Sequence, residues 1–206
     1  MRTFSSFRQL TGSTLVACLA AATVTLAQAP PVINSGRVTI AGTSNVHDYT
    51  ASTTQVRVTR ARLAVSAAAG ADLWDQALKP GAIEAFEIAI PAATLASPKG
   101  DLDKNMHKAL QVEAFPDITF RLTRIESGPD AAGARAIGML KIAGVEREVT
   151  LALTLKKSGA ALTVHGRVDL LMTDYGVTPP KAMLGMLKTD PKVTVTFETV
   201  VAIPTT

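Results

Sequence analysis

Residues 149–156, with the sequence VTLALTLK, decide the fold class, because large aliphatic side chains alternate in them with small or polar ones. An alternation with a period of two is typical of a β-strand that buries one face. The pattern returns clearly at 86–90, 118–122 and 193–197, and more weakly at 38–40, 56–58, 140–142 and 164–172. The sequence therefore predicts an all-β protein of about eight strands.

Turn residues separate these runs, at Gly128-Pro129-Asp130, Ala143-Gly144, 157–159 and Pro179-Pro180. Short connections without regular strand–helix alternation favour an antiparallel barrel or sandwich over a parallel α/β sheet. The alternation changes phase between Val58 and Leu63, which predicts a β-bulge.

Two short helices interrupt the strands. In the first, Asp101 is expected to cap residues 102–112, where Leu102, Met106, Ala109 and Leu110 share one face. A second short helix is expected over 182–187.

The N-terminal 29 residues have the features of a secretory signal peptide. Arg2 and Arg8 precede an apolar run over 15–26, and Ala27-Gln28-Ala29 is an A-x-A cleavage signal. We expect residues 1–29 to be removed and 30–206 to form one domain in the periplasm or outside the cell. A lipoprotein anchored through Cys18 is the alternative, because residues 15–18 resemble a lipoprotein box. No later apolar run is long enough to predict a membrane span.

The charge balance gives little support to nucleic-acid binding. The formal net charge is +4, and loss of Arg2 and Arg8 with the signal peptide lowers it to +2. Lysine and arginine are scattered, without a basic stripe interleaved with aromatic residues.

Strand length bears on function. Several alternating runs span about ten residues, or roughly 30 Å at the usual rise per residue. Their predicted inward positions are mainly Val, Ile, Leu and Met, and residues 30–206 contain only seven aromatic residues. A long barrel lined by mid-sized aliphatic residues permits an elongated apolar channel, although a fully packed sandwich shows the same alternation.

Seven segments, in order along the chain, resemble the YceI-like family, a group of exported bacterial proteins with an extended lipocalin-like barrel. The most specific element is a helix followed by Phe115-Pro116-Asp117-Ile118-Thr119-Phe120, and Tyr49 stands where tryptophan is commoner. The matching segments are 42–49, 86–95, 103–110, 115–120, 138–145, 149–151 and 172–180.

This resemblance implies an extended antiparallel lipocalin-like barrel whose lumen holds a polyisoprenoid, such as an isoprenoid quinone or a polyprenyl phosphate. The protein would be a carrier or scavenger of that lipid and would need no cofactor. A part in a stress response is one role that the resemblance allows. His47 and Tyr49 are candidates to contact a polar head group. The candidates to line the apolar channel are Phe86, Ile88, Ile90, Met106, Leu110, Phe120, Leu151, Leu153, Met172, Tyr175 and Phe197.

Catalytic and metal-binding patterns are not found in the sequence. It contains no nucleophile elbow, phosphate-binding loop or dinucleotide fingerprint, and its three histidines lack metal-ligand spacing. We therefore expect neither catalysis nor a metal site. Two alternatives stay open: a packed interaction module with no ligand, and an enzyme that uses His47 on a lipid head group. The sequence leaves a homodimer possible.

Overall fold

The computed structural model describes residues 31–64, 73–128, 130, 132–182 and 187–202. The expected signal peptide and Cys18 lie outside the described residues. So does most of the second expected helix: its flanking residues Ala182 and Leu187 belong to strands, so a helix over the whole of 182–187 is wrong.

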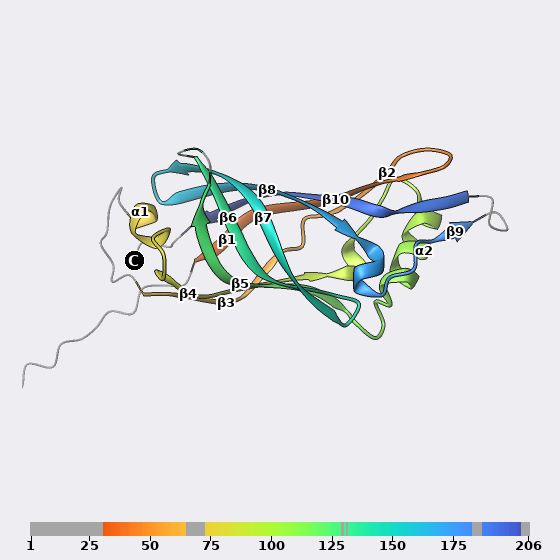
Figure 1. The fold of residues 1–206 in the computed structure, drawn as a ribbon, viewed down its shortest axis with the longest axis horizontal. Helices are drawn as coiled ribbons and strands as arrows, with labels where there is room; N and C mark the ends of the chain where they lie inside the picture. Colours follow the sequence, from red (N-terminus) through yellow and green to blue (C-terminus); the bar gives the residue numbers. More distant parts are fainter. Residues whose placement is uncertain (1–30, 65–72, 129, 131, 183–186, 203–206) are drawn as a thin grey trace, which may run out of the picture.

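Nine strands form one antiparallel sheet in the order β2-β1-β10-β8-β7-β6-β5-β4-β3. The sheet curls around the long axis of an elongated body, which confirms the predicted antiparallel lipocalin-like barrel (Figure 1). The strands are β1 (Val32–Ser44), β2 (Tyr49–Thr53), β3 (Arg57–Leu63), β4 (Ile83–Pro91), β5 (Asp117–Ser127), β6 (Gly133–Ile142), β7 (Val145–Ser158), β8 (Ala161–Leu171) and β10 (Leu187–Ala202), with the short β9 (Lys181–Ala182) paired to β10.

Strand β2 is the main element that the sequence pattern missed. Its inward positions carry Ala51 and Thr53, which are buried, instead of large aliphatic side chains. A pattern search for bulky alternating residues therefore passes over it. The predicted bulge is confirmed, since the register of β3 against β4 shifts between Val58 and Arg60.

The two ends of the sheet meet through a loop. Ser52 of β2 exchanges two backbone hydrogen bonds with Ala96, at 2.8 and 3.0 Å, and Ala96 follows β4 by a few residues. The hydroxyls of Thr53 and Thr94 are also hydrogen-bonded, at 2.7 Å. These bonds protect an edge strand that would otherwise present unpaired backbone groups.

Each end of the body carries one helix (Figure 1). Helix α1 (Leu73–Ala77) was not predicted, because five residues are too few to show helical periodicity. Helix α2 (Gly100–Leu110) confirms the first predicted helix, but Lys99 occupies its N-cap position, so the expected cap at Asp101 is wrong. The helix ends where Gln111 adopts a left-handed conformation with φ 53°. The 3₁₀ turns η1 (Ala92–Thr94) and η2 (Met172–Tyr175) follow β4 and β8.

Two aromatic rings lie flat against the sheet wall over buried glycines. A Cβ atom on Gly166 would come within 2.0 Å of the Phe197 ring, and Gly166 is the cross-strand partner of Phe197. A Cβ on Gly138 would come within 2.6 Å of the Phe120 ring. Because these rings cover the glycines and not the centre of the barrel, they leave the lumen open.

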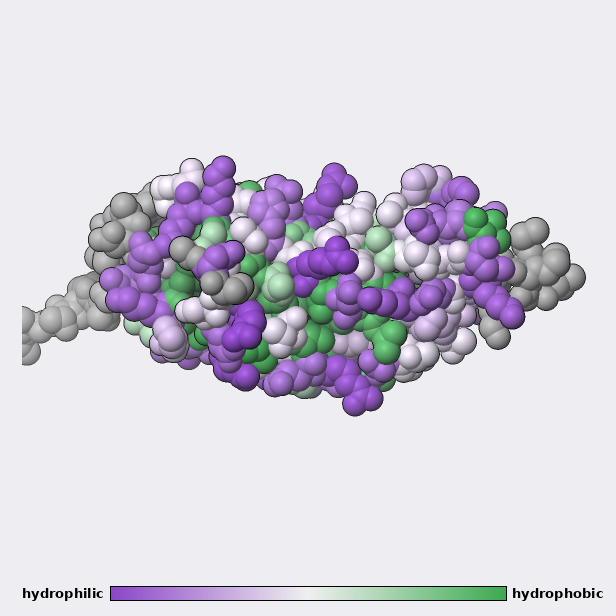
Figure 2. All heavy atoms as spheres, turned by 45° about the horizontal axis from the view of Figure 1, so that its top comes forward, coloured by the Kyte–Doolittle hydropathy of each residue, from purple (hydrophilic) through white to green (hydrophobic). Residues whose placement is uncertain are grey.

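Polar and charged residues cover much of the outer surface, with apolar residues showing between them (Figure 2). Arginines of β3 face carboxylates of β4 and β5, for example Arg57 and Asp117 at 2.9 Å. Such exposed pairs each contribute little to stability. The free energy of folding must therefore come mainly from the inner face of the sheet.

Candidate functional site

The lumen contains an apolar cavity of about 230 Å³. Its lining comes from all the long strands and from α1, and among the lining residues that the structure describes Thr199 supplies the one hydroxyl. An engineered apolar cavity of about 150 Å³ stays dry and takes up apolar ligands. This first cavity is therefore suited to hydrocarbon and not to water.

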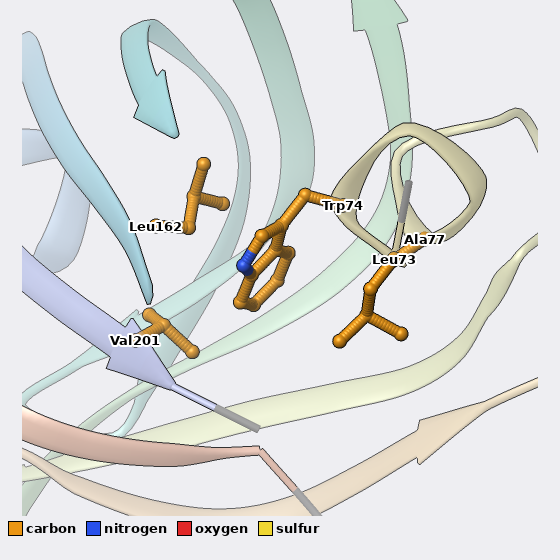
Figure 3. Close-up of a cluster of buried hydrophobic side chains, with 5 residues drawn as sticks. All are labelled: Leu73, Trp74, Ala77, Leu162 and Val201. Atoms are coloured by element: carbon orange, nitrogen blue, oxygen red, sulfur yellow. The ribbon is translucent and has the colours of Figure 1, made fainter. Parts of the chain in front are cut away.

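Helix α1 closes one end of the first cavity. The Trp74 indole extends from α1 toward Leu162 and Val201, as Figure 3 shows. Trp74 is 5% exposed, and its Nε1 donates a hydrogen bond to the Ala160 carbonyl at 3.1 Å. This end is a packed hydrophobic cluster whose single polar atom is satisfied.

A second cavity of about 100 Å³ lies at the other end, beneath α2 and η2. It adjoins the first at five side chains that line both cavities, and we call these five residues the junction. The junction consists of Ile40, Ile118, Ile142, Leu170 and Val195. The two apolar cavities therefore lie end to end along the barrel.

The structure places all eleven expected channel residues on the walls of these cavities. Seven line the first cavity, namely Phe86, Ile88, Ile90, Phe120, Leu151, Leu153 and Phe197. Four line the second cavity, namely Met106, Leu110, Met172 and Tyr175. Their part in binding a ligand stays a prediction.

Only one of the two head-group candidates lines a cavity. Tyr49 lines the second cavity, where its ring packs over Gly42. His47 is exposed in the turn after β1 and lines neither cavity. Its Nε2 lies 3.5 Å from Lys99 Nζ, while Ser44 Oγ accepts hydrogen bonds from the backbone of the same turn.

The other histidines have structural contacts. His107 Nε2 is hydrogen-bonded to the Leu95 carbonyl oxygen at 2.8 Å, which ties α2 to the segment after η1. His165 lies on the outer face near Glu198, as its alternation with Arg167 and Asp169 predicts.

Both tyrosines of the second cavity are held in the protonated state. Burial raises the pKa of Tyr49 and of Tyr175, and the nearby carboxylates Asp190 and Asp174 raise them further. A tyrosine with a raised pKa keeps its hydroxyl proton at neutral pH, so both side chains are available as hydrogen-bond donors.

Helix α2 covers the second cavity without burying any of its own residues completely. Besides the His107 contact, Asp103 Oδ1 accepts a hydrogen bond from the Ser97 backbone N–H at 2.7 Å. Hydrogen bonding from the Ser97 side chain and backbone holds the pKa of the Asp103 carboxyl below its usual range. These bonds anchor the helix over the cavity.

Replacing Asp103 by Ala should loosen α2. We expect backbone amides of α2 to exchange about fivefold faster, the worth of one hydrogen bond, in hydrogen-exchange mass spectrometry. Because the folded pKa is lowered, this anchoring is complete above the ordinary carboxyl pKa and is lost as pH falls through the lowered value. Asp101→Ala is the matched control, since Asp101 is exposed and pairs only with Lys104 at the surface. Equal exchange in the two variants would contradict the anchoring role.

Sequence reasoning missed Trp74 and Thr199 as cavity residues, and it missed α2's contact with the Leu95 segment. Trp74 lies on a helix too short to be predicted, and Thr199 is a polar residue at an inward position. That Trp74 is the chain's only tryptophan was the one available signal.

In the part of the chain that the structure describes, no three His, Cys, Asp or Glu side chains come together as a metal site would require. None of its helices combines the length and the apolar character needed to cross a membrane.

Comparisons with known proteins agree with this geometry. The model of the YceI-like domain family matches residues 35–201. No curated protein matches the chain.

Solved structures with the same fold include BcnA of Burkholderia cenocepacia, which is 15% identical with a TM-score of 0.62, over 81% of this chain and 96% of that one. A polyisoprenoid binding domain from Saccharophagus degradans, implicated in plant cell wall breakdown, is 12% identical with a TM-score of 0.62. The match covers 86% of this chain and 100% of that domain. The YCEI protein of Campylobacter jejuni is 13% identical with a TM-score of 0.51. The match covers 74% of this chain and 85% of that one.

Proposed function

The chain belongs to the YceI-like domain family, and from its two adjoining cavities we propose that it is a lipid-binding protein that encloses a long apolar chain. The observation that carries the proposal is the first cavity, whose lining offers a ligand almost nothing except carbon. Each buried CH₂ group stabilises a complex by about 0.8 kcal/mol, so a long chain binds tightly with few polar contacts.

The ligand that we favour is a polyisoprenoid. An elongated apolar space suits a long branched hydrocarbon, and a domain with this fold from Saccharophagus degradans is described as polyisoprenoid binding. The chain would occupy the first cavity and pass the junction. Its polar end would lie at the α2 end of the barrel, near Tyr49 and the exposed His47.

The proposed role is that of a carrier or scavenger in the periplasm, reached after removal of residues 1–29. Binding without chemistry fits the lining of both cavities, since the lining side chains that the structure describes include no carboxylate, imidazole, amine or thiol that could act as an acid, base or nucleophile.

A fluorescence titration tests this proposal directly, because the only tryptophan of the chain lines the first cavity. Adding a prenyl hydrocarbon such as squalene should change Trp74 emission with saturation near one molecule per chain. A hydrophilic compound of similar mass should leave the emission unchanged. Emission that does not respond to any prenyl compound, with native mass spectrometry finding no complex, would remove the proposal.

A further inference from the structure

Gly166 lies buried in the wall of the barrel, under the ring of Phe197. The two residues are cross-strand partners, and on its other side Gly166 pairs with Leu153 of β7. A Cβ atom on Gly166 would have Cζ, Cε1 and Cε2 of Phe197 as its nearest neighbours, all within 2.7 Å. Any side chain at position 166 would therefore collide with the outer edge of this ring, whereas glycine lets the ring rest on the backbone.

The wall positions around the ring carry larger side chains. Along β8, Val164 and Val168 stand on either side of Gly166, and along β10, Val195 stands beside Phe197. These three valines line the first cavity, as the Phe197 ring itself does. Because the ring cannot slide along a wall that other side chains occupy, a Cβ atom at position 166 would turn it toward the empty cavity.

The width of the first cavity bears on the kind of hydrocarbon chain that it accepts. A polyisoprenoid carries a methyl branch on every fourth carbon of its main chain, so it is wider than an unbranched chain. In a cavity that is wide enough, each branch is buried against the wall and adds to the affinity. In a narrower cavity the main chain still fits, but the branches are overpacked.

We propose that Gly166 sets the width of the first cavity and so makes the protein select methyl-branched over unbranched chains. The residue acts through Phe197, whose ring lies flat because position 166 has no side chain. The proposal rests on the proposed lipid-binding function, and it adds the residue that determines which class of hydrocarbon is bound.

Gly166→Ala is the substitution that tests this proposal. Gly166 does not have a positive φ, so its backbone accepts alanine. The atoms that the new methyl group would meet lie at the free end of a side chain, so the ring can move while the backbone stays in place. Gly138, which lies under Phe120, is less suitable, because a Cβ atom there would first meet the backbone carbonyl oxygen of Arg121.

The ligands are dodecanol and hexahydrofarnesol, which share the same main chain and hydroxyl and differ only in three methyl branches. Affinities are measured by Trp74 emission. In the unaltered protein the branches should raise the affinity about fiftyfold, as expected for burying three more carbons. In Gly166→Ala this gain should fall to about fivefold or less, while the affinity for dodecanol should stay within about twofold.

A double variant separates the contact from a general disturbance of the fold. Leucine at position 197 lacks the ring atoms that a Cβ atom on Gly166 would meet, so in a Phe197→Leu background Gly166→Ala should no longer lower the gain from branching. Gly36→Ala is the matched control, because its Cβ atom would meet Ile33 and Val56 at an ordinary contact distance of 3.4 Å and would displace no ring. It should keep the full gain from branching.

The outcomes distinguish the role of Gly166 from lipid binding itself. If branching gives no gain in the unaltered protein, or the same gain in Gly166→Ala, the proposed role of Gly166 is wrong while lipid binding stands. An equal loss of the gain with and without the Phe197 ring would also overturn it. If neither alcohol binds to the unaltered protein, the proposed function fails as well.

A second measurement uses the unaltered protein, in case Gly166→Ala does not fold. With hexahydrofarnesol bound, nuclear Overhauser effects should connect the Phe197 ring protons both to the α-protons of Gly166 and to methyl branches of the ligand. A ring that contacts the ligand but not Gly166 would contradict the proposal.

Discussion

Val195→Trp is expected to lower the affinity for a long prenyl lipid by about a thousandfold. Val195 belongs to the junction and faces Ile40 across the β1–β10 pair, so an indole there blocks the passage between the two cavities. A chain that cannot pass loses the burial of at least one five-carbon unit, about 4 kcal/mol at 0.8 kcal/mol per CH₂ group.

The measurement is a titration with prenyl hydrocarbons of increasing length. In the unaltered protein, affinity should rise with each unit until the chain fills both cavities. In Val195→Trp the rise should stop at a shorter chain. Thr196→Trp is the matched control, because Thr196 is the exposed neighbour on the same strand and lines neither cavity. Identical length dependence in both variants would show that ligands do not pass the junction.

Trp74→Ala is expected to destabilise the fold by about 3–5 kcal/mol, the usual cost of removing a buried tryptophan. The change leaves a void between Leu162 and Val201, and it leaves the Ala160 carbonyl without its hydrogen-bond donor. For a chain of this size the loss should lower Tm by roughly 10 °C. Thermal unfolding followed by circular dichroism measures it.

Trp74→Phe separates the two contributions, because it keeps an aromatic ring in the cluster and removes only the hydrogen bond and part of the packing. Its loss should be about 1–2 kcal/mol. If Trp74→Ala changed Tm by less than about 3 °C, α1 would not be the packed closure of the first cavity.

The alternation of side chains predicted most of the sheet, because burial on one face of a long strand dictates that pattern directly. It failed at β2, where Ala51 and Thr53 are buried but small, and at α1, which is too short for a period to appear. A helix over the whole of 182–187 was wrong, since its first and last residues belong to β9 and β10, and apolar residues in so short a segment also suit the ends of strands.

The sequence predicted which residues of the candidate site point inward, but it did not predict the shape of the cavities that they line. That Phe120 and Phe197 lie flat over Gly138 and Gly166 depends on contacts between neighbouring strands. No single-strand pattern shows such contacts, although they decide whether the lumen is filled or open.

We propose that this barrel encloses a long apolar lipid. The most direct measurement is native mass spectrometry of the protein purified without detergent, followed by solvent extraction and analysis of the bound material. We predict about one prenyl lipid per chain, released by solvent and rebound on addition. Protein that carries no lipid, and that binds no prenyl compound when one is supplied, would contradict the proposed lipid-binding function.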